Sequence, residues 1–220
     1  MKLHYVTIAT KPHPILKNIQ KKASQNGETI HILGQEEDRN IGWHANGNFG
    51  LKLKLVKDFL KNKDIHEEDL ILFTDAYDVI YYGDFQTIIE RFHMFDKPII
   101  FGAETTCSPD PNMKLYYDFI NTTFPFLNSG LYIGKVNALR SCLESYEYRD
   151  QHDDQLFWTY TFLKNKEHIE LDYKNEIFLN TYGIDIEDIN ISKQGIYYKG
   201  KNPLFLHVNG PDKSEINKFL

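Results

Sequence analysis

The stretch DLILFTDAYDVI, residues 69–80, decides how this sequence is interpreted. Residues 70–73 form a short, continuous apolar run, which is typical of a strand buried on both faces of a sheet. Asp75 and Asp78 follow at the carboxyl end of that strand, where open α/β sheets place their ligands. Two carboxylates held close together repel each other unless a proton or a cation separates them. Because Mg²⁺ and Mn²⁺ prefer oxygen ligands and also hold substrate phosphates, one hypothesis is a metal–diphosphate site.

The same two aspartates also fit an ordinary solvated turn. Aspartate is common in turns, and the D-x-x-D pattern is frequent by chance. The spacing alone therefore leaves the metal site and the turn as open alternatives.

Alternating strand and helix patterns surround this stretch. The hydrophobic periodicity predicts helices at 15–24, 49–61, 85–95, 137–146 and 152–163. It predicts strands at 3–9, 29–33, 70–74, 98–103, 169–171, 177–179, 186–191 and 204–207, with mixed loop and strand at 126–134. This alternation indicates an α/β fold with a mostly parallel central sheet and helices on both faces. Since no linker rich in proline, glycine or serine interrupts it, we expect residues 1–220 to form one domain.

Composition and missing motifs exclude several classes of protein. The formal net charge is −6, which argues against a nucleic-acid binder, because such proteins need clustered positive charge. Cys107 and Cys142 are too few for a disulfide framework, and neither sits in a C-x-x-C zinc pattern. The sequence has no G-x-G-x-x-G after its first strand and no G-x-x-x-x-G-K-[ST], so neither a dinucleotide fingerprint nor a P-loop is predicted.

The hydrophobic pattern also bears on the compartment. No stretch of about 18 apolar residues is present, so no membrane span is predicted. The chain enters a strand at once, without the apolar region of a signal peptide. We therefore expect a cytoplasmic protein or, if the sequence is a trimmed piece, a protein of the secretory pathway or endoplasmic reticulum. The glycosylation sequons at Asn121 and Asn190 would matter only in the second case.

A second acidic group, Asp153-Asp154-Gln155, precedes the apolar positions of the helix expected at 152–163. An aspartate there can cap the helix by accepting backbone N–H bonds, and it meets the helix dipole. Two adjacent carboxylates and a glutamine exceed what a cap requires, so a capping role and a binding role both stay open.

The stretch FLHVNGPDK, residues 205–213, places a histidine, a glycine and a lysine after another strand. His207 could bind a metal, Gly210 would let the backbone approach a phosphate, and Lys213 would neutralise that phosphate. An edge histidine, a Gly-Pro turn and a solvated lysine would give the same sequence. Asn128, which a serine and a glycine follow, could likewise bind sugar hydroxyls or stabilise its own turn.

His152, Asp154 and His207 also fit a two-histidine, one-carboxylate iron site. Oxygenases with such sites usually have a jelly roll of many short strands, whereas this sequence alternates strands and helices. The iron site would also leave Asp75 and Asp78 without a role, so the pattern favours the metal–diphosphate hypothesis.

Taken together, these segments resemble the glycosyltransferase domain of the procollagen lysyl hydroxylases. The similar motifs follow one another in the same order over nearly the whole chain. They are TIATK (7–11), FTDAYDVI (73–80), AE (103–104), FLNSG (126–130), DDQLF (153–157), LD (171–172), IF (177–178) and HVNGP (207–211). Each motif is modest, but their common order is specific.

The resemblance implies a GT-A-like fold that binds a UDP-sugar through a divalent metal ion, usually Mn²⁺. Carried over by motif, Asp75, Asp78 and His207 are the implied protein ligands of the Mn²⁺ (or Mg²⁺) ion. The diphosphate of the donor would complete the coordination shell.

The resemblance also implies roles in binding the donor and in catalysis. For the base, the resemblance implies that Tyr77 stacks on the uracil and that Thr7 lies beside it. Lys52 is implied near the phosphate or ribose, and Asn209, Gly210 and Lys213 near the diphosphate. Trp43, from a poorly matching segment, is the candidate for a uridine-binding or gate residue. Asp154 is the leading candidate for positioning the acceptor or stabilising the oxocarbenium-like transition state. Asp153 is the second candidate, and Asn128 is expected to line the same pocket.

The reaction implied by the resemblance is transfer of glucose from UDP-glucose to galactosyl-hydroxylysine in collagen or a collagen-like chain, with retention of configuration. The alternatives are a UDP-galactose-dependent transferase acting on hydroxylysine, a UDP-sugar transferase for another glycan, and a non-catalytic lectin-like binder. We also expect a stand-alone transferase without lysyl hydroxylase activity.

The sequence departs from the family pattern at several positions. Ser108 stands where the family commonly has tryptophan, so the acceptor side is expected to differ. Val208 replaces a glycine, and His152 replaces an aspartate of the family's acidic run.

Overall fold

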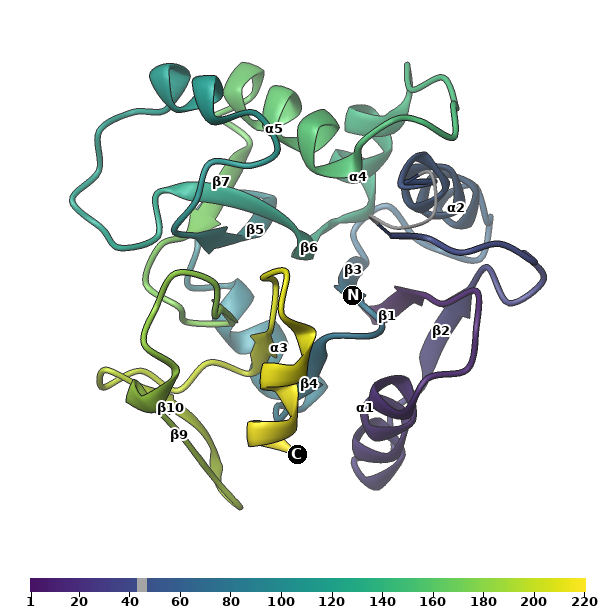
Figure 1. Cartoon of the computed structure of the whole chain (residues 1–220). Helices are drawn as coiled ribbons and strands as arrows, with labels where there is room; N and C mark the ends of the chain where they lie inside the picture. The colour runs from purple at the N-terminus through teal and green to yellow at the C-terminus, as the bar shows by residue number, and fades with distance from the viewer. Residues whose placement is uncertain (43–46) are drawn as a thin grey trace.

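The computed structural model describes residues 1–42 and 47–220 and is built around one six-stranded sheet (Figure 1). In order across the sheet, its strands are β2 (Ile30–Leu33), β1 (Leu3–Ile8), β3 (Leu70–Asp75), β6 (Phe126–Lys135), β5 (Ile99–Glu104) and β7 (Ile169–Asp172). The pairs β1–β2, β1–β3 and β5–β7 are parallel, whereas β6 runs antiparallel to both of its neighbours. The sheet is therefore mostly parallel, with one reversed strand.

Helices cover both faces of this sheet. On one face lie α2 (Gly50–Leu60), α4 (Val136–Leu143) and α5 (Asp154–Lys164), and on the other lie α1 (Pro14–Gln25) and α3 (Phe85–Phe92). Each helix turns an apolar side inward; in α1 the buried residues Ile15, Leu16, Ile19 and Ala23 follow the helical period. This arrangement confirms the predicted α/β fold class.

A smaller sheet adjoins the carboxyl end of β3. Its strands, in order, are β4 (Val79–Tyr81), β11 (Phe205–His207) and β8 (Phe178–Asn180). β11 runs antiparallel to β4 and parallel to β8, so His207 is paired with Val79 on one side and with Asn180 on the other. Because β4 begins directly after Asp78, this sheet carries His207 back to the two aspartates.

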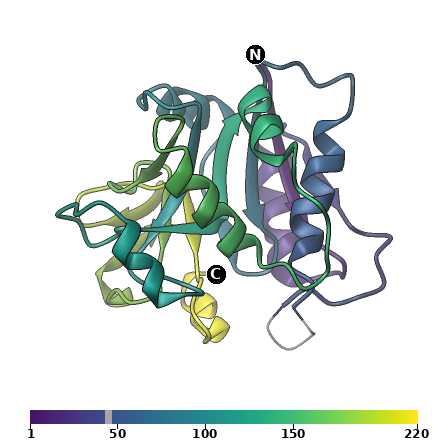
Figure 2. The same ribbon diagram turned by 90° about the horizontal axis from the view of Figure 1, so that it is seen from above.

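Short elements complete the chain. They are the hairpin of β9 (Ile189–Ser192) and β10 (Gly195–Tyr198) and the 3₁₀ helices η1 (Pro111–Tyr116), η2 (Ile186–Asp188) and η3 (Lys213–Phe219). Figure 2 shows η3, in yellow, at the end of the main sheet opposite the N-terminus. None of the helices in the described residues is long and apolar enough to cross a membrane.

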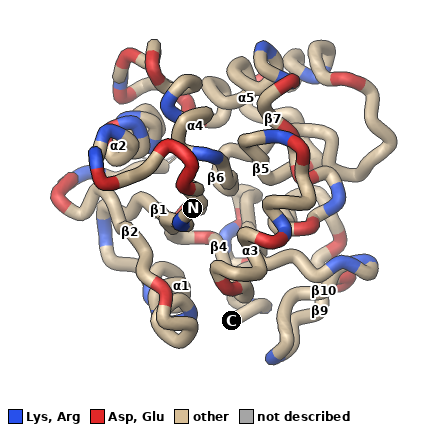
Figure 3. Tube along the Cα trace, turned by 180° about the vertical axis from the view of Figure 1, so that it is seen from behind, with Lys and Arg blue, Asp and Glu red and all other residues tan. Residues whose placement is uncertain are grey.

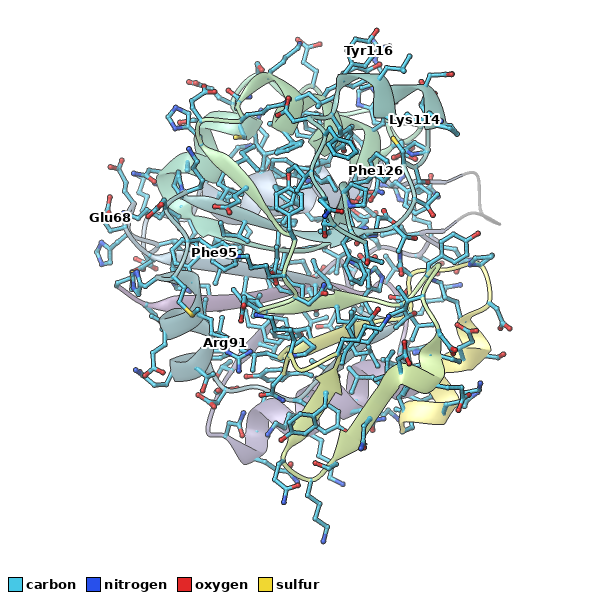
Figure 4. All side chains as sticks on the ribbon, turned by 90° about the vertical axis from the view of Figure 1, so that its left-hand side faces the viewer. Glu68, Arg91, Phe95, Lys114, Tyr116 and Phe126 are labelled. Atoms are coloured by element: carbon cyan, nitrogen blue, oxygen red, sulfur yellow. The ribbon has the colours of Figure 1, made fainter. Side chains whose placement is uncertain are left out.

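Aromatic rings and one arginine join the layers. The Tyr132 ring of β6 stacks on Phe73 with centroids 4.8 Å apart and lies 5.5 Å from Trp158 of α5. Arg91 of α3, labelled in Figure 4, donates hydrogen bonds to the backbone carbonyls of Glu176 and Asn202. The ring contacts fasten the main sheet to α5. The hydrogen bonds of Arg91 fasten α3 to the segments that precede β8 and β11.

The connection between β5 and β6 projects from the body of the protein. Met113 is buried and Tyr117 packs on Phe162, so the connection is anchored from within. Its apolar residues Leu115 and Phe119 are exposed, as is Tyr116, which lies at the outer margin of Figure 4.

The structure differs from the sequence predictions in a few elements. β4 and β10 were not predicted, because each is only three or four residues long and directly follows a turn. The segment predicted as mixed loop and strand at 126–134 is a continuous strand, β6. Its polar residues suggested a turn, but their side chains are satisfied by tertiary partners instead.

Candidate active site

A cavity of about 650 Å³ lies where β3 and β11 end. This volume falls in the range of small-molecule sites. The predicted site residues in its wall are Lys52, Asp75, Tyr77, Asp78, Asn128, Asp153, Asp154, His207, Asn209 and Lys213. Segments far apart in the sequence thus converge on one cavity.

Asp75, Asp78 and His207 form a cluster in this cavity. His207 Nε2 lies 3.8 Å from Asp75 Oδ2 and 3.4 Å from Asp78 Oδ2. One ligand atom from each of the three residues lies within 4.8 Å of the others. Two carboxylates and one imidazole nitrogen suit a divalent ion such as Mn²⁺ or Mg²⁺, because the ion would offset the repulsion between the carboxylates. The residues therefore fit the metal that the resemblance implies.

Two lysines border this cluster. Lys213 Nζ lies 2.6 Å from Asp78 Oδ2, and Lys52 Nζ lies 2.7 Å from Asp75 Oδ1. Burial would raise the pKa of Asp78, but the neighbouring side chains of His207 and Lys213 hold that pKa below its usual range. Asp78 is therefore ionised, and thus able to bind a cation, at neutral pH.

Lys52 connects the Asp75–Asp78–His207 cluster to the second acidic group, Asp153 and Asp154. This buried lysine extends from α2, which carries several lysines (Figure 3), and its Nζ also lies 2.9 Å from Asp154 Oδ2. Burial would lower the pKa of Lys52, but the carboxylates of Asp154 and Asp75 raise it above its usual value. The lysine is therefore charged and holds the two aspartates at a fixed separation.

Asp153 and Asp154 have different surroundings. Asp153 is the N-cap of α5, and its Oδ1 accepts a 2.8 Å hydrogen bond from the backbone N–H of Leu156. Asp154 Oδ2 accepts a 3.0 Å hydrogen bond from the Ser129 hydroxyl and is paired with Lys52. Asp153 thus performs the capping role that its position allowed, while the charge of Asp154 is directed toward β6 and α2.

Glu104, at the end of β5, is a cavity residue that sequence reasoning did not select. It is buried, and its carboxylate accepts hydrogen bonds from the side-chain amides of Asn128 (3.1 Å), Gln155 (2.5 Å) and Asn209 (2.8 Å). Burial raises the pKa of Glu104. The available signal was its position directly after a predicted strand, where ligands of α/β sheets bind.

Gly130 of β6 is a second residue whose importance the sequence did not reveal. A Cβ atom on Gly130 would lie 2.5 Å from His207 Cε1 and 2.8 Å from Asp75 Oδ2. Such distances are too short for any side chain, so a glycine is required for β6 to pass the Asp75–Asp78–His207 cluster.

The remaining predicted donor-binding residues occupy different positions. The Tyr77 hydroxyl accepts a 3.0 Å hydrogen bond from the Lys11 N–H, and its ring lies 4.9 Å from that of His13. Thr7 is fully buried and its hydroxyl donates to the Thr74 carbonyl, so its side chain does not line the cavity. Trp43 lies outside the described residues.

Gly210 and His152 also lie apart from the Asp75–Asp78–His207 cluster. A Cβ on Gly210 would lie 2.6 Å from Tyr182 Cδ2, so the close approach at this glycine is to an aromatic ring. The His152 ring contacts the Tyr146 hydroxyl at 3.2 Å and is not in the cavity wall. The structure therefore does not assemble the alternative iron site of His152, Asp154 and His207.

Sequence comparisons place these residues in a known family. The family model described as "PLOD GT domain" matches residues 1–220. The chain is 32% identical over 227 residues to the multifunctional procollagen lysine hydroxylase and glycosyltransferase of Caenorhabditis elegans. The matched region covers 96% of this chain and 31% of that protein. It is 28% identical over 222 residues to human procollagen-lysine,2-oxoglutarate 5-dioxygenase 1, and this match covers 96% of this chain and 30% of that protein. The chain spans about a third of the length of these curated relatives.

Solved structures agree with the fold. A glycosyltransferase involved in glycosylation of the major capsid of PBCV-1 matches with a TM-score of 0.57 at 10% identity, over 100% of this chain and 98% of that chain. Mouse xyloside xylosyltransferase 1, in its apo form, matches with a TM-score of 0.55 at 11% identity, over 95% of this chain and 98% of that chain. The fold is that of GT-A glycosyltransferases. Since the family model matches the chain from its first residue to its last, the chain belongs to the PLOD glycosyltransferase domain family.

Proposed function

We propose that this chain transfers glucose from UDP-glucose to galactosyl-hydroxylysine in collagen or a collagen-like polypeptide, with retention of configuration. The family membership supports glycosyl transfer, and the names of two relatives point to procollagen as the substrate class. The observation that carries the proposal is the convergence of Asp75, Asp78 and His207 in one cavity with Lys213.

The metal cluster and Lys213 would hold the donor's diphosphate. A bound Mn²⁺ or Mg²⁺ ion would supply Lewis-acid stabilisation of the leaving diphosphate. Lys213 would add a second positive charge next to Asp78, and Tyr77 would offer its ring to the uracil. The residues of β3, β4 and β11 would thus bind the part of the donor that leaves.

The opposite wall would bind the sugar and the acceptor. Glu104, Asn128 and Asp154 supply hydrogen-bonding groups on β5, β6 and α5. Lys52 and Ser129 hold the Asp154 side chain in a fixed orientation, which suits a residue that positions an acceptor hydroxyl or stabilises developing positive charge. Asp154 is therefore the leading catalytic candidate. Asp153 is the second candidate, although its Oδ1 already caps α5.

The test is UDP release from UDP-glucose and from UDP-galactose, with and without Mn²⁺. Peptides containing galactosyl-hydroxylysine and unmodified hydroxylysine are the two acceptors. Mn²⁺-dependent release that needs the galactosylated peptide and prefers UDP-glucose is expected. Preference for UDP-galactose as donor and for the peptide with unmodified hydroxylysine as acceptor would replace the proposal with the galactosyltransferase alternative. Mn²⁺-dependent UDP binding without transfer to either peptide would indicate another acceptor or a lectin-like binder.

A further inference from the structure

Asn180 connects the main sheet to the metal cluster through its side-chain amide. It is the last residue of β8 and is fully buried. Its Nδ2 donates a 2.9 Å hydrogen bond to the backbone carbonyl of Ala103 in β5. Its Oδ1 lies 2.8 Å from His207 Nδ1 on the neighbouring strand β11. Neither sequence reasoning nor the function proposed above gives this residue a role.

The two partners of Asn180 determine where the proton of His207 lies. The Ala103 carbonyl can only accept a hydrogen bond, so the amide nitrogen of Asn180 must face it. The amide oxygen then faces His207, and since this oxygen can only accept, His207 Nδ1 must carry the hydrogen. In a neutral imidazole the other nitrogen, Nε2, then has a free lone pair.

That lone pair is directed at the metal cluster. Nε2 lies 3.4 Å from Asp78 Oδ2 and 3.8 Å from Asp75 Oδ2, while the His207 side chain is 4% exposed. A lone pair facing two carboxylates is unfavourable unless a cation occupies the space between them. Hydrogen bonds to the remote nitrogen of a ligating histidine commonly fix its tautomer and its orientation.

We propose that Asn180 is a positioning residue that holds His207 in its Nδ1–H tautomer, with Nε2 directed at the ion held by Asp75 and Asp78. The chain of contacts runs from the Ala103 carbonyl through the Asn180 amide to the imidazole. This inference rests on the divalent metal of the proposed function, but it does not depend on which sugar or acceptor is used.

The first test is ¹⁵N NMR of the metal-free, histidine-labelled protein at a pH where the imidazole is neutral. The His207 signals are identified by their loss in His207→Gln. The unsubstituted protein is expected to show hydrogen on Nδ1 and a bare Nε2. Hydrogen on Nε2 would overturn the inference, and this measurement needs neither a variant of Asn180 nor sugar transfer.

The second test is the affinity for Mn²⁺ in the absence of any sugar nucleotide. Asn180→Ala is expected to weaken Mn²⁺ binding by about 10- to 100-fold and to release His207 from its single tautomer. Asn175→Ala is the matched control, because it removes another buried amide, which donates to the Phe178 carbonyl at the turn before β8. The control is expected to lose stability but to keep the parent's Mn²⁺ affinity.

The outcomes separate a positioning role from a structural one. Unchanged Mn²⁺ affinity in Asn180→Ala, or equal weakening in both variants, would overturn the inference. If Asn180→Ala does not fold, Asn180→Leu takes its place, because it also removes the acceptor for Nδ1–H while filling the space of the amide, and the same loss of Mn²⁺ affinity is expected. If His207 shows the expected Nδ1–H tautomer but the protein turns over no UDP-sugar, this inference stands and the proposed function is contradicted.

Discussion

Two pairs of neighbouring aspartates face the same cavity but serve different purposes. Asp75 and Asp78 follow a strand, and an oxygen of each lies within 4 Å of His207 Nε2. Asp153 and Asp154 begin a helix; one caps the backbone, and the other is paired with Lys52. In the proposed function the first pair shares a cation, whereas the second pair is divided between capping α5 and binding on the sugar side of the cavity.

The difference arises from the backbone that follows each pair. The first turn of a helix has backbone N–H groups without partners inside the helix, and they bind the nearest carboxylate, here Asp153. After β3, the chain turns into β4 and pairs with β11, so Asp75 and Asp78 face a histidine instead. The same residue type thus takes its role from the element that comes next.

The largest expected effect comes from Asp78→Asn. It removes one charged ligand of the proposed ion, which contributes several kcal/mol to stabilising the leaving group, so transfer should fall by about 10²- to 10³-fold and Mn²⁺ affinity should fall with it. Asp153→Asn, from the other pair, is the matched control for Mn²⁺ affinity, since asparagine also caps helices and Asp153 lies outside the metal-binding cluster. Initial rates check the loss of transfer in Asp78→Asn and Mn²⁺ titrations compare the two variants, and equal losses of Mn²⁺ affinity would contradict the comparison.

Lys52→Met should remove the link between the two pairs. It leaves Asp75 and Asp154 without their shared cation in a mostly buried site, so the free energy of unfolding should fall by about 2–3 kcal/mol, less than for a fully buried pair because Asp75 is partly exposed. Lys54→Met, on the solvent side of α2, is the control. Urea denaturation measures both, and equal stability of the two variants would show that Lys52 does not join the pairs.

Gly130→Ala should disturb the strand-end pair while sparing the helix pair. The new Cβ would press on His207 and Asp75, and overpacking of this kind costs about 1–3 kcal/mol, which we expect to appear mainly as weaker Mn²⁺ binding. Gly134→Ala on the same strand is the control, because its Cβ would come no closer than 3.0 Å to any atom, the nearest being Ile99 Cγ1. Mn²⁺ titration of both variants distinguishes them, and equal affinities would count against the placement of β6.

The smallest expected effect is a difference in the sign of pH dependence. The folded-state pKa of Asp78 is lowered, so its contribution to stability is present above its unfolded pKa of about 4 and is lost as the pH falls. The pKa of Asp153 is raised by burial and by the charge of Asp154, so its contribution grows as the pH falls and is lost as the pH rises. Unfolding free energies between pH 7 and about pH 2 should show the parent's advantage over Asp78→Asn shrinking mainly below about pH 4, and the stability of the parent relative to Asp153→Asn rising as the pH falls toward about 4. Parallel curves for the two variants would be the contrary result.

Sequence periodicity predicted the parts of the fold that are long and regular. The apolar run at 70–73 and the period of α1 identified β3 and the helices, because burial of one face leaves a pattern within a single element. β4 and β10 escaped prediction, since strands this short carry little periodic signal. The pairing of β4 with β11 is also non-local, so no local pattern could reveal it.

The candidate site followed the same rule. Asp75, Asp78 and His207 could be selected from residue type and position after strands. Glu104 and Asn180 also directly follow predicted strands, at 98–103 and 177–179, so the same rule could have selected them. Gly130 could not be selected in this way, because it lies within β6 and its role depends on contacts with a distant strand. A glycine within β6 shows no signal until the neighbouring strand brings His207 against it.

The most direct test of the central claim is calorimetric titration of UDP into the protein with and without Mn²⁺, repeated with Asp75→Ala. The account predicts that UDP binds the parent protein only when Mn²⁺ is present and that Asp75→Ala abolishes this Mn²⁺-dependent binding. Equally tight UDP binding without Mn²⁺, or unchanged binding by Asp75→Ala, would contradict a metal–diphosphate site at the end of β3.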